Sequence, residues 1–126
     1  MSLPAKIVRT LPPPHSEKEK KVKKIECIIP HTKFSELEKA LRIRGVPGMT
    51  VSDVKGFGNE QTRPEPYLFL PKVKIEIFCA EEEAEDILAV ILNICKTGKL
   101  GAGKVAVYQV EDLIRIRTGE RGAIAV

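Results

Sequence analysis

Hydrophobic and polar residues follow a regular pattern in six segments that come after residue 22. In four of them apolar residues alternate with polar ones or form a short run, which predicts β-strands. In the other two, apolar residues recur every three or four positions, which predicts amphipathic helices. The strands are expected at residues 23–30, 49–58, 69–80 and 104–110, and the helices at residues 32–44 and 81–96.

Each predicted helix has a recognisable start and one apolar face. Thr32 is a suitable N-cap for the first helix, and Gly45 ends that helix after Arg44. Five of the first six residues of the second helix are acidic, which complements the helix dipole. The expected buried faces are Phe34, Leu37, Ala40 and Leu41 in the first helix, and Ile87, Leu88, Ile91, Ile94 and Cys95 in the second.

The order strand, helix, strand, strand, helix, strand predicts an α+β fold of the ferredoxin-like βαββαβ type. In this arrangement two helices cover one face of an antiparallel four-stranded sheet. Lys74 and Glu76 alternate with apolar residues in the third strand, so the uncovered face is mixed and suits either solvent or another subunit. Residues 59–68 contain two prolines and no helical period, which predicts a loop.

Charge separates the first residues from the rest of the chain. Residues 1–24 hold seven Lys or Arg against two Asp or Glu, whereas the remaining 102 residues hold fourteen against fifteen. The first segment is also rich in proline, so residues 1–21 are interpreted as a flexible Pro/Lys-rich extension and residues 22–126 as one folded domain. A solvated extension is favoured over a nucleic-acid or membrane role for these basic residues.

Composition excludes several classes of protein. No apolar run approaches the roughly 18 residues of a membrane span, and the first residues lack the apolar core of a signal peptide, so a cytoplasmic protein without membrane insertion is expected. Three single cysteines within apolar patterns predict buried thiols and no metal site. Aromatic residues make up only 5% of the chain and form no RNA-binding motif, which argues against nucleic-acid recognition.

The segment TGKLGAGK, from Thr97 to Lys104, suggests a phosphate site. Glycines let backbone N–H groups surround an anion, and Lys104, Arg115 and Arg117 supply positive charge. The spacing resembles a P-loop, but Val105 stands where that motif needs a magnesium-binding Ser or Thr. A solvated Gly/Lys turn, with the arginines on a charged strand edge, is the alternative interpretation.

Several strings together resemble the PII signal-transduction family: KKIECIIPHTKFSELEKAL, GVPGMTVSDVKGFG, FLPKVKIEI and TGKLGAGKVAVYQVEDLIRIRTGERG. The resemblance implies a ferredoxin-like subunit, a homotrimer, and an adenine nucleotide bound in each cleft between subunits. It further implies a non-enzymatic regulator that senses ATP, ADP and often 2-oxoglutarate. A loop between the second and third strands then docks on a transporter or enzyme of nitrogen or carbon assimilation.

Transferred to this sequence, the resemblance implies that the glycine loop and Lys104 hold phosphates from one subunit while Arg115 and Arg117 reach them from its neighbour. The base and ribose side is implied for Gly48, Met49 and Thr50, for Gly56, Phe57 and Gly58, and for Phe78, which replaces a usual aliphatic residue. The glycine-loop members are Gly101, Ala102, Gly103 and Lys104, with Ala102 in place of a usual acid.

The segment after Gly58 departs most from the resemblance. Only ten residues separate Gly58 from Phe69, which is shorter than the family's docking loop. The family's glutamine that contacts magnesium and 2-oxoglutarate is replaced by Glu60, unless Gln61 takes its register. A carboxylate there disfavours 2-oxoglutarate by like-charge repulsion, although the acid-binding Lys72 is kept. Tyr67 matches the family's modified tyrosine, with packing against the sheet as the favoured alternative.

These observations predict a nucleotide-binding regulator, with ATP or ADP as ligand and AMP as a further candidate. The need for magnesium stays open, and bicarbonate is an alternative co-ligand to 2-oxoglutarate. An ATP-hydrolysing enzyme that uses the Gly/Lys loop is the alternative function. It is disfavoured because no Walker B acid and no hydroxyl after Lys104 are present, and no catalytic set is expected.

Overall fold

The structure, a computed structural model, describes residues 20–58 and 69–126. In this part of the chain the elements follow the predicted βαββαβ order, with a short 3-10 turn after the first strand and another near the end. They are β1 (Val22–Pro30), η1 (His31–Lys33), α2 (Phe34–Arg44), β2 (Thr50–Gly56), β3 (Leu70–Ala80), α3 (Glu81–Cys95), β4 (Lys104–Val110) and η2 (Gly122–Ala125).

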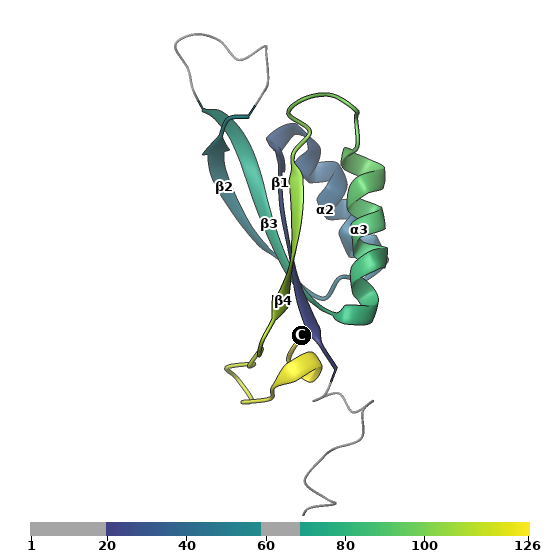
Figure 1. Cartoon of the computed structure of the whole chain (residues 1–126), viewed down its shortest axis with the longest axis vertical. Coiled ribbons are helices and arrows are strands. Elements are labelled where there is room, and N and C mark those ends of the chain that lie inside the picture. Colours follow the sequence, from purple (N-terminus) through teal and green to yellow (C-terminus); the bar gives the residue numbers. More distant parts are fainter. Residues whose placement is uncertain (1–19, 59–68) are drawn as a thin grey trace, which may run out of the picture.

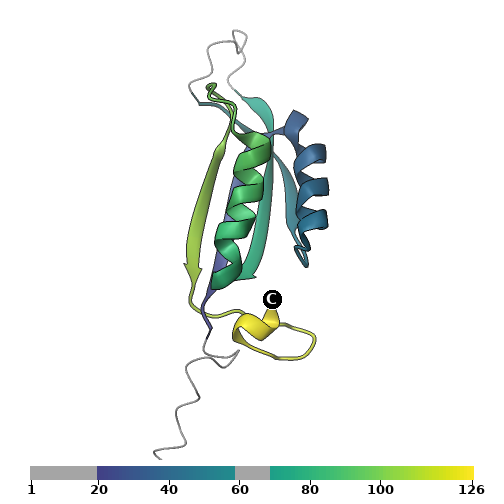
Figure 2. The ribbon, with the colours of Figure 1, turned by 90° about the vertical axis from the view of Figure 1, so that its right-hand side faces the viewer.

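The four strands form one antiparallel sheet in the order β2-β3-β1-β4. β1 lies in the middle, so that Ile25 stands opposite Ile77 of β3 on one side and Val107 of β4 on the other. Both helices lie against the same face of the sheet (Figures 1 and 2). The predicted ferredoxin-like α+β fold is therefore confirmed.

The hydrophobic core lies between the sheet and the two helices. Alternate residues of β1 and β3 point to the helices, and the predicted helix faces meet them. Of those faces Leu37, Leu41, Ile87, Ile91 and Cys95 are buried and Phe34, Leu88 and Ile94 partly buried against the core. Each fully buried aliphatic side chain contributes about 1.5–3 kcal/mol relative to exposure, so this layer accounts for most of the driving force for folding.

The three cysteines are buried free thiols, as their sequence context predicts. Cys27 and Cys79 lie on the core face of the sheet and Cys95 on α3. Burial away from water raises the pKa of the Cys27 thiol to about 12. These side chains therefore act as small apolar core residues and not as nucleophiles.

The start of the first helix differs from the sequence prediction, whereas its end does not. Thr32 is not the N-cap, because it lies inside the turn η1 and the helix begins only at Phe34. An N-cap needs non-helical backbone angles, and the chain already turns tightly directly after the extended Pro30. At the other end Gly45 adopts a left-handed φ of 95° and its N–H donates to Leu41 and Arg42 carbonyls.

The uncovered face of the sheet carries both ion pairs and apolar side chains. Lys24 of β1 lies 2.7 Å from Glu76 of β3, and its ammonium also lies 5.6 Å from the centre of the Tyr108 ring of β4. Phe78 and Tyr108 stand opposite Lys24 in the register, on either side of it, and both are exposed. This face is therefore mixed, as the alternation in β3 predicts.

After β4 the chain folds back across the end of the sheet where β1 begins (Figure 2). Residues 113–122, the C-terminal hairpin, are held by a bridge between Ile114 and Arg121 and by a bond from the Gly122 N–H to the Leu113 carbonyl at 2.9 Å. The hairpin leads into η2, whose Ala123 is buried. No helix in the described ranges is long and apolar enough to cross a membrane.

Candidate functional site

The glycine loop between α3 and β4 packs against the end of β1. Gly98, Gly101 and Gly103 all have left-handed φ values, of 75°, 87° and 111°. At Gly103 a Cβ atom would lie only 2.1 Å from the Ile28 carbonyl oxygen, so no other residue fits without a shift of backbone. The tight approach fixes the loop, and with it the first residue of β4.

That first residue is Lys104, which stands opposite Ile28 at the edge of the sheet. Its side chain is exposed and has no carboxylate partner among residues 20–58 and 69–126. An unpaired ammonium beside a loop of left-handed glycines can attract a phosphate, because the charge is not already neutralised. The structure thus brings together the predicted residues Gly101, Gly103 and Lys104.

The end of β2 and the start of β3 lie at the same end of the sheet as the glycine loop (Figure 1). Gly56 pairs with Leu70, and the rings of Phe57 and Phe69 meet edge to face with centroids 5.5 Å apart. Lys72 is buried at 9% exposure and pairs with Pro30 of β1. We call this region the glycine-loop end of the sheet.

A cavity of about 280 Å³ lies at the opposite end of the sheet, which we call the pocket end. Four residues predicted for the base and ribose side line it together: Gly48, Met49, Thr50 and Phe78. Its other lining residues are Pro47, Glu76, Leu113, Ala125 and Val126. An aromatic ring, a thioether and a few polar groups form walls that suit a planar base.

Glu76 places a negative charge in the wall of this cavity. It stands opposite Thr50 in the register and accepts a hydrogen bond from Lys24 at 2.7 Å. The Lys24 ammonium lowers the pKa of the Glu76 carboxyl below its ordinary value, chiefly through that hydrogen bond. Glu76 therefore stays ionised near neutral pH and can accept hydrogen bonds from amino or hydroxyl groups of a ligand.

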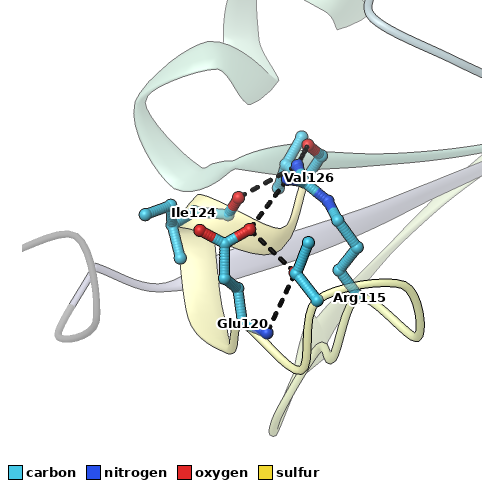
Figure 3. Close-up of polar contacts among 5 residues, drawn as sticks. Arg115, Glu120, Ile124 and Val126 are labelled. Carbon is cyan, nitrogen blue, oxygen red and sulfur yellow. Dashed lines mark hydrogen bonds and ion pairs between the residues drawn. The ribbon is translucent and has the colours of Figure 1, made fainter.

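The two predicted arginines both lie on the C-terminal hairpin, at the pocket end. Arg117 is exposed in the turn at the tip and has no charged partner within the described part of the chain. Arg115 is already engaged (Figure 3), since it donates to Glu120 at 2.9 Å and to the backbone oxygens of Ile124 and Val126 at 3.1 and 3.0 Å. Of the two arginines, Arg117 therefore offers the charge that no carboxylate in residues 20–58 and 69–126 neutralises.

The structure does not assemble all the predicted residues within one chain. Gly56, Phe57 and Gly58, which the resemblance groups with Gly48 to Thr50, lie at the far end of β2 from them. Lys104 is likewise separated from the pocket, because the register places it level with Ile28 and Lys74. The pocket residues Glu76 and Phe78 lie two and four residues further along β3 and two strands across the sheet, roughly 12–16 Å away at the usual strand spacings. Glu60, Gln61 and Tyr67 fall outside the described residues.

Sequence reasoning missed the part of the pocket that the end of the chain supplies. Ala125 and Val126 follow no periodic pattern, and no residue in that stretch carries recognisable chemistry. Glu76 could have been found from the strand register, because the alternation puts it on the uncovered face beside Thr50.

Comparisons with known proteins agree with this architecture. Residues 22–120 match the family model of nitrogen regulatory protein P-II. The nitrogen regulatory protein P-II of Rhizobium meliloti is 45% identical over 112 residues, which cover 83% of this chain and 100% of that protein. The corresponding protein of Pasteurella multocida is 42% identical over 112 residues, with the same coverage of 83% and 100%.

Two solved structures are similar in fold and sequence. The B. subtilis GlnK–ATP complex gives a TM-score of 0.72 at 31% identity and covers 84% of this chain and 96% of its own. Arabidopsis thaliana PII bound to citrate gives a TM-score of 0.71 at 38% identity, with coverage of 86% and 94%. The fold and its relatives define a small ferredoxin-like regulatory protein. The chain belongs to the nitrogen regulatory protein P-II family.

Proposed function

We propose that this protein is a non-enzymatic regulator that binds ATP or ADP between the subunits of a homotrimer and docks on a transporter or metabolic enzyme. The observation that carries the proposal is the division of the site between two ends of one sheet. Phosphate-binding features lie at the glycine-loop end and a base-sized cavity lies at the pocket end. The ATP complex of the related B. subtilis GlnK supports the choice of ligand.

The division favours a site shared between copies of the chain. Because Lys104 and the pocket residues of β3 are roughly 12–16 Å apart, the glycine loop of one copy completes a site only with the pocket end of another. Such a contact joins two different surfaces, so it repeats from copy to copy and forms a ring when the rotation between copies closes. Three copies are what the family resemblance implies, and each then contributes Lys104 to one site and Arg117 to the next.

The uncovered face of the sheet supports assembly as well. Ile28, Phe78 and Tyr108 on this face are 37%, 38% and 47% exposed. Exposed apolar side chains that share one face are typical of a surface that another subunit covers. The same face also carries charges: Lys24 pairs with Glu26 and Glu76, and Lys74 stands opposite Ile28 in the register. A neighbouring copy can bury the apolar part of this face while the charged residues lie at its rim.

A regulator is favoured over the alternative ATP-hydrolysing enzyme. Val105 follows Lys104 and carries no hydroxyl for a magnesium ion bound to phosphate. Glu76, the charged side chain that lines the pocket, forms an ion pair with Lys24 and is therefore not available as a general base. Nucleotide binding that changes affinity for a docking partner, without turnover, fits these side chains.

Complementation between two inactive variants tests the shared site directly. Lys104→Ala removes the cation at the glycine-loop end, and Arg117→Ala removes the cation at the pocket end. Each variant alone should bind ATP at least tenfold more weakly, because losing a charge-assisted contact costs about 1.5–3 kcal/mol. Trimers formed by co-expressing both variants should recover tight binding at about a quarter of their sites. This is the fraction of sites in which an intact Lys104 from one subunit faces an intact Arg117 from its neighbour.

The control is the double variant Lys104→Ala/Arg117→Ala, in which every site is defective. Calorimetric titration of ATP gives the number of tight sites per trimer in each preparation. No recovery in the mixed trimers would show that a single chain supplies both cations. Lys99→Ala, which removes a cation from the same loop, is the second control. If ATP affinity in Lys104→Ala is as little changed as in Lys99→Ala, the phosphate role of Lys104 is refuted.

A further inference from the structure

Arg115 is tied to the last residues of the chain by an ion pair and two backbone bonds. Its guanidinium donates to Glu120 Oε1 at 2.9 Å and to the backbone oxygens of Ile124 and Val126 at 3.1 and 3.0 Å (Figure 3). Glu120 is itself oriented by Thr118, whose hydroxyl donates to the same carboxylate oxygen at 2.8 Å. The carboxylate thus neutralises a cation that the site would otherwise offer to a ligand.

The segment that Arg115 holds is also a wall of the cavity. Ala125 and Val126 line the space at the pocket end together with Thr50 and Phe78. Because Arg115 contacts the backbone oxygens of Ile124 and Val126, on either side of Ala125, a loss of these contacts would change the cavity wall. The charge of Arg115 and the shape of the pocket are therefore linked through one short segment.

We propose that Glu120 is a specificity-determining residue that competes with ligand phosphate for Arg115. The inference rests on the proposed nucleotide site. A phosphate that reaches Arg115 must share the guanidinium with Glu120 or displace it, because two anions on one cation repel each other. A nucleoside without phosphate leaves the pair intact, so Glu120 lowers the affinity for nucleotides without affecting the base.

The competition has a size that can be measured. Arg115 and Glu120 side chains are 33% and 37% exposed, and ion pairs at such positions are weak. Removing the negative charge by Glu120→Gln, which keeps the shape and the acceptor oxygen, should therefore tighten ATP binding by about two- to fivefold. Adenosine binding should stay unchanged, because the glutamine keeps a hydrogen bond to Arg115 and so the pocket wall, and adenosine brings no charge to Arg115.

The matched control is Glu111→Gln, which removes the same charge from a neighbouring position. Glu111 and Glu120 line one cavity beside the C-terminal hairpin, but Glu111 has no ion pair with any residue in the described ranges. If the effect is specific to Arg115, Glu111→Gln should leave the ratio of ATP to adenosine affinity near its wild-type value. An equal gain in both variants would mean a general charge effect and would overturn the proposal.

A double-mutant cycle with Arg115→Gln separates competition from a merely structural role. If Glu120 acts through Arg115, Glu120→Gln should have no effect on ATP affinity when Arg115 is already replaced. Calorimetry on the full chain gives the four ATP affinities, and circular dichroism confirms that each variant is folded. The proposal fails if Glu120→Gln weakens ATP binding, leaves it unchanged, or shifts ATP and adenosine by the same factor.

The two proposals fail in different ways. A wild-type protein that binds no ATP contradicts the nucleotide site itself, and with it the present inference. A wild-type protein that binds ATP, with no gain in Glu120→Gln, contradicts only the competition by Glu120.

Discussion

Gly103 shows how strongly one residue can constrain the candidate site. An added Cβ atom at this position would lie 2.1 Å from a backbone oxygen of β1, and the residue also has a φ of 111°. At Gly98 in the same loop φ is 75° as well, but an added Cβ atom would meet nothing within 4 Å. Substitutions at the two glycines therefore distinguish the effect of a left-handed φ alone from the effect of a left-handed φ together with a steric clash.

We expect Gly103→Ala to lower the free energy of unfolding by about 2 kcal/mol or more, since it combines an unfavourable φ with displacement of the β1 end. Gly98→Ala should cost only about 1 kcal/mol, the price of a left-handed alanine. Urea unfolding of both variants gives the comparison. Equal losses would show that the loop moves away from β1 without difficulty.

At the scale of the elements, the ion pair between β1 and β3 gives the sheet a defined response to acid. The hydrogen bond from Lys24 lowers the pKa of Glu76 below its ordinary 4.5. A depressed carboxyl pKa stabilises the folded state above the ordinary value, and that contribution is lost as the pH falls through the depressed pKa. The pair therefore links β1 to β3 at neutral pH and not in strong acid.

Replacing the carboxylate by Glu76→Gln should accordingly destabilise the protein at pH 6 to 7, and the difference from wild type should shrink as the pH falls below about 4.5. Urea midpoints across this pH range measure it. Asp53→Asn, which removes an exposed acid of β2, is the control. A constant difference at every pH would show that Glu76 acts by shape and not by charge.

Sequence patterns predicted the elements well because alternation and helical spacing report directly on burial. Ile25, Ile75 and Ile91 all lie where the pattern puts them. The start of the first helix was wrong because a tight turn follows Pro30 and leaves Thr32 no capping geometry. The pocket wall formed by Ala125 and Val126 could not be predicted, since it depends on a chain reversal held by Arg115 and not on a local period.

At the scale of the whole molecule, the tip of the C-terminal hairpin projects away from the rest of the chain. Ile116 at this tip is 98% exposed, beside the exposed Arg117. A fully exposed isoleucine contributes nothing to the fold of one chain but gains from burial in an assembly. It is therefore expected to lie against the neighbouring subunit.

Ile116→Asp should shift the protein from trimers toward smaller species while leaving the chain folded. Ile43→Asp is the matched control, because Ile43 is 80% exposed on α2, away from the divided site. Size-exclusion chromatography with light scattering over a range of protein concentrations distinguishes the two. A trimer equally stable in both variants would place the hairpin tip in solvent.

The edge-to-face pair of Phe57 and Phe69 has a consequence for how long the segment between the two rings can be. The two rings contact each other directly beyond the paired residues Gly56 of β2 and Leu70 of β3. With the ends fixed, doubling the length of such a segment adds only about 0.6 kcal/mol of closure entropy. The number of residues between the two rings can therefore vary widely with little cost to the fold.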